Sequence, residues 1–159
     1  MPLLPGKGQS ARERSFATAM TDSDRRAYCQ VRLTVPFHDL DPMNMVWHGN
    51  YLKYFDRARF ALFDKYGIDL YTYSKETGHL FPIIKTSTKF VAPLRARDIL
   101  LCKATVLDAT VKIVMDFEIR VEGKGEICAK GRSEQVAVKF PEMEMMFEIP
   151  EEIRKALGF

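Results

Sequence analysis

One long helical pattern lies among five strand patterns, and this combination narrows the available folds more than any other feature. Between Tyr51 and Tyr66 the apolar residues recur at steps of three and four, and Gly67 follows as a natural helix end. Residues 29–37 alternate between apolar and polar, which is typical of a half-buried strand. After the helix, β-branched and aromatic residues predict four more strands, at 80–91, 98–107, 111–121 and 126–140.

The short segments between the later strands predict an antiparallel sheet. They are DAT (108–110) and EGKG (122–125), which are too short for a crossover between parallel strands. Five strands bury the wide apolar face of one helix only if their sheet curls around it. We therefore predict an α+β fold, with one long central helix wrapped by a curved five-stranded antiparallel sheet. Pairing between copies, as a homodimer or homotetramer, would cover the edge strands.

The chain length indicates one domain. It has 159 residues, and we assign 27–159 to the domain and 1–26 to a flexible leader. A polar linker is expected after the long helix. The segment PEEIRKAL (150–157) predicts a short closing helix, since Pro150 and two glutamates suit a helix start.

Charge and hydropathy exclude two classes of partner. The net charge is +3, and the leader holds five basic residues against three acidic ones, so the rest of the chain is almost neutral. Nucleic acid is therefore not expected as a partner, because its binding requires a basic face. No apolar run approaches the length that spans a bilayer, so membrane insertion is not expected either.

The cysteines favour a reducing compartment. Cys29, Cys102 and Cys128 are odd in number and have no CxxC spacing, so we expect free thiols, no metal and no redox cofactor. We predict a cytoplasmic protein. The Arg- and Ser-containing residues 1–20 leave organelle targeting as an alternative, and Met20 is an alternative start.

Polar residues gather in one otherwise apolar stretch, FHDLDPMNMVWHGNY (37–51). A buried carboxylate is costly unless it is paired or used, which makes this stretch the first place to look for function. Asp41 precedes Pro42, which disfavours helical geometry at the aspartate and holds it in an extended turn. The helix then begins close to His48, so unpaired backbone N–H groups should point back toward this turn.

The stretch and the element order together resemble the hotdog-fold acyl-CoA thioesterases of the 4-hydroxybenzoyl-CoA thioesterase type. The family's pattern at this place is an aromatic residue, two aspartates one residue apart, a turn, Val, an aromatic residue, often His, then Asn and Tyr before a helix that carries Arg. The residues in these roles are Phe37, Asp39, Asp41, Val46, Trp47, His48, Asn50, Tyr51, Phe55 and Arg57 or Arg59. The segments APLRARDIL (92–100) and QVAVKF (135–140) also resemble the family, and the resemblance covers about residues 28–153.

The resemblance implies a thioester hydrolase that cleaves an acyl- or aryl-CoA to the free acid and CoA. Asp41 would be the nucleophile or the general base for water, and the backbone N–H of His48 would stabilise the oxyanion at the helix start. His48 is thus a catalytic candidate, and its imidazole either orients the reactants or is a helix-start side chain without a role. Asp39 would shape the turn. Some branches of this fold use a helix carboxylate in catalysis, which makes Asp56 the lesser catalytic candidate beside Asp41; the preferred role of Asp56 is to pair with Arg57 or Arg59 elsewhere in a dimer.

The expected substrate-binding residues surround the same turn. They are Asn44, Val46, Trp47, Gly49, Tyr51 and Arg95. Relatives commonly have glycine in the turn, whereas this chain has Met43, Asn44 and Met45, and asparagine tolerates the left-handed geometry that glycine would adopt. Trp47 is either an acyl contact or core, and Arg95 is either a partner of the CoA phosphates or a solvated side chain.

Three other functions fit the same fold. An acyl-carrier-protein thioesterase would differ in the carrier, and a catalytically silent module would bind an acyl group without turnover. The segment GHLFP (78–82) resembles part of the hotdog dehydratase signature, but there the histidine precedes a helix and here it precedes a predicted strand.

Overall fold

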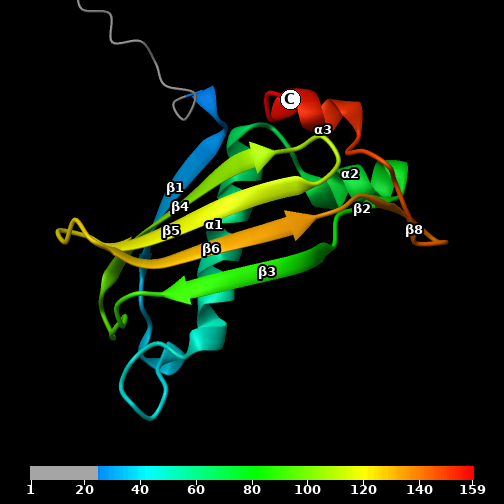
Figure 1. The fold of residues 1–159 in the computed structure, drawn as a ribbon. Coiled ribbons are helices and arrows are strands. Elements are labelled where there is room, and N and C mark those ends of the chain that lie inside the picture. Colours follow the sequence, from blue (N-terminus) through cyan, green and yellow to red (C-terminus); the bar gives the residue numbers. More distant parts are fainter. Residues whose placement is uncertain (1–24) are drawn as a thin grey trace, which may run out of the picture.

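The computed structural model describes residues 25–159, which form a curled sheet around one long helix (Figure 1). The helices are α1 (Tyr51–Lys65), α2 (Leu70–Thr77) and α3 (Glu151–Ala156). The strands are β1 (Tyr28–Thr34), β2 (His79–Leu80), β3 (Ile83–Phe90), β4 (Ile99–Asp108), β5 (Ile113–Val121), β6 (Ile127–Gln135), β7 (Val138–Lys139) and β8 (Glu144–Met145). The predictions for residues 1–20, for a start at Met20 and for most of the leader lie outside the described residues.

The main sheet has five strands in the order β1-β4-β5-β6-β3, and all neighbouring strands are antiparallel. Alternate residues of the central strands are buried against α1, as in the cross-strand pairs Cys102 with Ile119 and Ala104 with Phe117. Figure 1 shows α1 lying across one face of this sheet. The predicted α+β architecture, with one long central helix and a five-stranded antiparallel sheet, is confirmed.

A glycine in the sheet sets how closely α1 approaches it. The Phe55 ring from α1 stacks on Phe117 of β5, with 4.8 Å between ring centroids. A Cβ atom placed on Gly131 of β6 would lie 2.4 Å from the Phe55 ring, closer than any real contact. Glycine at this position therefore lets an aromatic residue of the helix lie directly on the strand.

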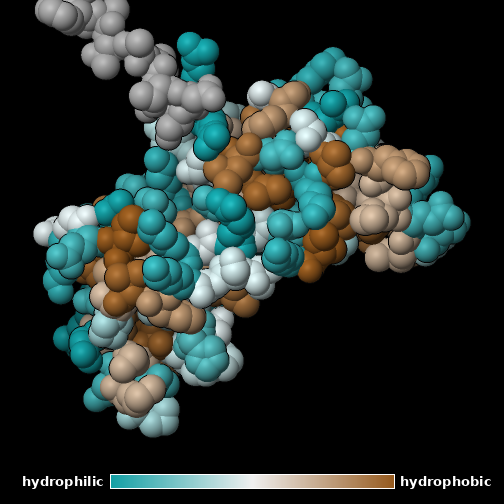
Figure 2. All heavy atoms as spheres, viewed as in Figure 1, coloured by the Kyte–Doolittle hydropathy of each residue, from teal (hydrophilic) through white to brown (hydrophobic). Residues whose placement is uncertain are grey.

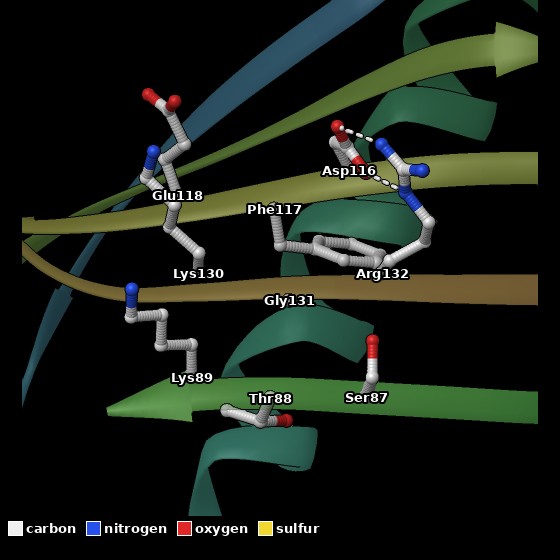
Figure 3. Close-up of a pocket in the computed structure, with 9 residues that line it drawn as sticks. All are labelled: Ser87, Thr88, Lys89, Asp116, Phe117, Glu118, Lys130, Gly131 and Arg132. Atoms are coloured by element: carbon white, nitrogen blue, oxygen red, sulfur yellow. Dashed lines mark hydrogen bonds and ion pairs between the residues drawn. The ribbon is translucent and has the colours of Figure 1, made fainter. Parts of the chain in front are cut away.

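The opposite face of the main sheet is charged. Figure 3 shows Asp116 of β5 and Arg132 of β6 joined by two hydrogen bonds, of 2.6 and 2.8 Å. Glu118, Lys130 and Lys89 lie on the same face, on three successive strands. The main sheet thus has an apolar face against α1 and a polar face toward solvent.

The edge strand β3 is exposed over nearly its whole length. Seven of its eight residues are exposed, and these include Ile83, Ile84 and Phe90. The other edge strand, β1, alternates between exposed and half-buried residues. An unpaired edge with large apolar side chains is a template for another strand.

Two predicted strands divide between two sheets. The expected strand 80–91 is β2 followed by β3, and the expected strand 126–140 is β6 followed by β7. Leu80 pairs with Val138, and Val136 N–H donates to the Pro82 carbonyl oxygen at 3.2 Å. The two segments of the chain therefore leave the main sheet together. They form a second, three-stranded sheet in the order β2-β7-β8.

Three smaller predictions meet different outcomes. The closing helix is confirmed as α3. The expected polar linker after α1 is wrong, because it contains α2, which Asp69 begins by accepting a hydrogen bond from Thr72 N–H (3.1 Å) and Gly78 ends at φ 74°. The first strand ends at Thr34 rather than at residue 37, since Phe37–Asp39 forms a 3₁₀ turn.

Candidate active site

Asp39 anchors the turn between β1 and α1. Its buried carboxylate accepts hydrogen bonds from Lys53 Nζ (2.8 Å) and Tyr54 Oη (2.6 Å), both on α1. Its backbone carbonyl accepts from Trp47 N–H and Asn50 Nδ2, each at 2.9 Å. Burial alone would raise the pKa of Asp39, but the hydrogen bonds from Lys53 and Tyr54 outweigh it and hold that pKa below its usual value.

Asp41 closes a tight loop with one carboxylate oxygen and leaves the other free. Its Oδ1 accepts from Met43 N–H (2.8 Å) and, more weakly, Met45 N–H (3.4 Å). Asp41 N–H donates to the Met45 carbonyl at 2.8 Å, and Asn44 N–H donates to the Asp41 carbonyl at 3.0 Å. Within residues 25–159, Asp41 Oδ2 accepts no hydrogen bond from the protein.

The start of α1 presents two unpaired donors. Residues His48–Asn50 form a 3₁₀ turn that runs directly into the helix. Trp47 N–H and Asn50 N–H have acceptors, whereas the N–H groups of His48 and Gly49 donate to no acceptor in the described part of the chain. Unpaired N–H groups at a helix start carry a partial positive charge, which suits an anion or a polarised carbonyl oxygen.

Trp47 lies over Gly49. A Cβ atom on Gly49 would lie 2.2 Å from the Trp47 ring, so the ring occupies the space that any other residue would need. The Trp47 and His48 rings are 5.0 Å apart between centroids, and the Trp47 side chain is half exposed. Trp47 therefore shapes the helix start.

Asp41 and His48 line one cavity, of about 320 Å³, together with the end of β3. Its other lining residues are apolar except for the hydroxyl of Tyr51: Met43, Met45, Val46, Tyr51, Phe90, Val91, Ala92 and Pro93. Tyr51 is buried, which raises the pKa of its hydroxyl, and its ring meets Phe90 edge-on at 4.8 Å. The cavity thus has one polar end, at the helix start, and apolar walls.

The structure brings Asp41, His48, Val46 and Tyr51 together and leaves the four other predicted site residues outside the cavity lining. Asn44 is exposed at φ 62°, so it takes the left-handed turn geometry expected of it. Arg95 is exposed, and its backbone N–H donates to Asp98 Oδ2 at 2.8 Å. The Trp47 ring lies against Gly49, whose backbone N–H is one of the two unpaired donors at the helix start.

The expected pairing of Asp56 with Arg59 is present, but within one helix rather than across a dimer. Asp56 forms an ion pair with Arg59 one turn further along its own helix. Arg59 is buried, donates to Ser133 Oγ at 2.8 Å and lies 5.3 Å from the Phe117 ring centroid. The three-residue spacing on a helix face would have allowed the placement of this pair within α1 to be predicted.

Residues from β3 complete the cavity and were not predicted. Phe90 ends β3, and Val91, Ala92 and Pro93 follow it. They lie about 40 residues from the polar stretch in sequence, so no local pattern connects them to it. His79 begins β2 and stacks on Tyr73, away from this cavity.

Within residues 25–159, no three His, Cys, Asp or Glu side chains gather as a metal site. The same residues include no helix long and apolar enough to cross a membrane.

The fold resembles several solved thioesterases. A 1,4-dihydroxy-2-naphthoyl-CoA thioesterase from Synechocystis matches with a TM-score of 0.74 and 20% identity, over 82% of this chain and 95% of that one. A DHNA-CoA thioesterase from Staphylococcus aureus matches with a TM-score of 0.70 and 21% identity, over 76% and 80%. A mutant 4-hydroxybenzoyl-CoA thioesterase in complex with 4-hydroxybenzoyl-CoA matches with a TM-score of 0.74 and 18% identity, over 83% and 99%. A search of curated protein sequences found no match.

A curled sheet around one helix, with a polar turn at the helix start, defines a hotdog-fold protein. A sequence profile described as the thioesterase-like superfamily matches residues 35–157. Because this match spans most of the chain, the protein belongs to the thioesterase-like superfamily.

Proposed function

We propose that the protein hydrolyses the thioester of an acyl-CoA, releasing the free acid and CoA. One observation supports this most: the half-free carboxylate of Asp41 and His48, whose backbone N–H is unpaired, line the polar end of an apolar cavity, and the unpaired N–H of Gly49 directly follows in the chain. Membership of the thioesterase-like superfamily supports the same reaction class, and the CoA thioesters named for the similar structures support CoA as the carrier.

The two sets of groups would act on opposite sides of the thioester carbonyl. The carbonyl oxygen accepts hydrogen bonds from His48 and Gly49 N–H, which stabilise the negative charge that develops on attack. Asp41 Oδ2 then either attacks the carbonyl carbon, forming an anhydride that water later hydrolyses, or removes a proton from the attacking water. In both routes the C–S bond breaks, and the CoA thiolate leaves and takes up a proton.

The walls of the cavity favour an apolar acyl group. Among the described residues, the acyl walls carry no side-chain hydrogen-bonding group apart from the Tyr51 hydroxyl. A substrate hydroxyl buried against Met43, Met45 or Phe90 would lose its water without gaining a partner, which costs about 1–3 kcal/mol. We therefore propose aliphatic or unsubstituted aryl acyl groups over hydroxylated ones.

The exposed β3 edge supports a homodimer. Two copies that pair through β3 would satisfy the free edge and cover Ile83, Ile84 and Phe90. Since Phe90 also lines the cavity, the dimer interface would adjoin the active site. The three free thiols support a reducing compartment such as the cytoplasm.

The first test is thiol release from a panel of short, long, branched, aromatic and hydroxylated acyl-CoAs. We expect Asp41→Asn to lower kcat by at least about 100-fold on the best substrate, a typical loss when an acid or base catalyst is removed. His48→Ala keeps the backbone N–H, so we expect it to retain activity within about tenfold of wild type. Asp64→Asn, which changes an exposed carboxylate on α1, serves as the matched control.

Two results would contradict the proposal. One is that no acyl-CoA is hydrolysed by the wild-type protein. The other is that Asp41→Asn, with an unchanged circular dichroism spectrum, hydrolyses the best substrate as fast as wild type. A larger loss in His48→Ala than in Asp41→Asn would move the essential role to the imidazole.

A further inference from the structure

A hairpin near the C-terminus exposes four large apolar side chains. We call residues 139–148 the Met–Phe hairpin; it contains β8, and Figure 1 shows it projecting from one end of the molecule. Phe140, Met143, Met145 and Phe147 are 59%, 52%, 67% and 94% exposed. The space-filling view in Figure 2 shows apolar surface at this projecting end. Such a concentration of exposed apolar residues marks an interaction surface.

The hairpin is also acidic. Glu142, Glu144 and Glu148 are exposed on it, and only Glu148 forms an ion pair within residues 25–159, with Arg154 at 3.5 Å. Met143 stands at φ 57°, a left-handed conformation that glycine or asparagine adopts more readily. The chain thus keeps a large apolar side chain at a turn position where backbone geometry favours a small one.

The cavity offers a surface of matching character. Its walls are apolar, and Met43, Phe90 and Val91 on its lining are exposed. Arg95 and Arg97 directly follow the segment that forms the β3 side of the cavity, and both are exposed. Neither forms an ion pair with another described residue. An apolar, acidic hairpin therefore complements this rim in both hydrophobicity and charge.

Symmetry would bring the two surfaces together. When two copies pair antiparallel through β3 about a two-fold axis, the Ile83 end of one strand lies beside the Phe90 end of the other. The hairpin is fixed to the Ile83 end, because Lys139 and Val138 pair with His79 and Leu80 just before β3. The cavity lies at the Phe90 end. Each hairpin then reaches toward the cavity of the other copy.

We propose that the Met–Phe hairpin of one copy closes over the acyl cavity of the second copy. This inference rests on the proposed function and on pairing through β3. It assigns part of the acyl-binding surface to Met143, Met145 and Phe147 of the other subunit. Each cavity is incomplete in a single chain.

Disulfide trapping tests the contact independently of turnover. The variant carries Met43→Cys at the cavity and Met145→Cys on the hairpin, in a Cys29→Ser background. Mild oxidation is expected to join two chains, giving a band of twice the mass on a non-reducing gel. The single variants, and Met43→Cys combined with Val111→Cys at an exposed turn, are expected to stay monomeric on the gel. A double variant that forms no covalent dimer, or closes a disulfide within one chain, overturns the proposal.

A binding measurement separates this inference from the proposed function. We expect Met143→Ser/Met145→Ser/Phe147→Ser to weaken binding of a non-hydrolysable long-chain acyl-CoA thioether by about tenfold, while leucine at the same three positions preserves it. Equal Kd values for the wild type and the serine variant would overturn the hairpin contact. Failure of the wild-type protein to bind any thioether would instead contradict the proposed function, and the trapping result would still decide the hairpin.

Discussion

Asp39 and Asp41 stand two residues apart, and the chain uses their carboxylates differently. Asp39 is buried and accepts from Lys53 and Tyr54, whereas Asp41 is half-buried with Oδ2 unbonded to the described protein. A paired carboxylate is held in place, and a half-free one is available for chemistry. The sequence predicted that Asp39 shapes the turn, but its partners lie 14 and 15 residues away, beyond the reach of a local pattern.

The lowered pKa of Asp39 predicts a pH-dependent contribution to stability. A carboxyl whose pKa is lower in the folded than in the unfolded state stabilises the fold above its unfolded pKa of about 3.9. This contribution is lost as the pH falls through the folded pKa. Asp39→Asn should therefore lower the free energy of unfolding by about 1–3 kcal/mol at pH 7 and by less at pH 3.

Urea unfolding at the two pH values measures this difference. Asp116→Asn, which breaks an exposed ion pair with Arg132, is the matched control, and its cost should stay within about 1 kcal/mol. If Asp39→Asn lowered the free energy of unfolding equally at pH 7 and pH 3, the pH-dependent contribution of the Asp39 carboxylate would be contradicted.

Gly49 predicts a coupled change in structure and activity. In Gly49→Ala the new methyl group must displace the Trp47 ring, which now lies where the Cβ atom would be. Trp47 is the only tryptophan of the chain, so its fluorescence reports the displacement directly. We expect a shifted emission maximum together with reduced hydrolysis. Gly125→Ala, where a Cβ atom meets nothing within 4 Å, should change neither, and an unaltered spectrum in Gly49→Ala would contradict the geometry.

At the scale of elements, the contact between α1 and β6 depends on Gly131. Gly131→Ala would force the Phe55 ring away from the strand and disturb its stacking on Phe117. Overpacking of this kind typically costs about 1–3 kcal/mol, which chemical denaturation would measure. Gly125→Ala is again the control. A Gly131→Ala variant as stable as wild type would show that the helix shifts without cost.

The elements themselves were predictable to different degrees. The long helix and the central strands were readable because each buries one face in a regular period, as the alternation in β5 illustrates. The β6 to β7 boundary was not readable, since the sequence runs from Gln135 into VAVKF without a glycine or proline, and the change of sheet rests on the contact of Val136 N–H with the Pro82 carbonyl. Helix α2 carried readable signals at both ends, the Asp69 cap at its start and Gly78 at its end. Its eight residues are too few to show a clear helical period of apolar residues, so the helix itself was not predicted.

At the scale of the whole molecule, the exposed β3 edge predicts a dimer that a single charge would weaken. Ile84→Glu places a carboxylate on each of two strands that would pair, and burying it there is costly. Gel filtration with light scattering should give twice 18.3 kDa for wild type and a shift toward 18.3 kDa for Ile84→Glu. Val111→Glu, at an equally exposed residue outside the sheet edge, should remain dimeric. A wild-type monomer at micromolar concentration would contradict the dimer.

At this larger scale too, only part of the site could be predicted from the sequence. The polar half of the cavity, with Asp41 and His48, comes from one continuous stretch and was predicted from it. The apolar half comes from Phe90 to Pro93, which only the curl of the sheet brings to the helix start. The size and chemistry of the acyl pocket are therefore properties of the tertiary structure.

The location of the cysteines decides which kinetic experiments are practical. Cys102 and Cys128 are buried, and burial raises the pKa of the Cys102 thiol to about 12, so neither should react quickly with a thiol dye. Only Cys29, which is half-buried, needs replacement. With Cys29→Ser, released CoA remains visible even when enzyme exceeds substrate. Single turnovers can then be followed, and bond cleavage can be timed separately from the departure of products.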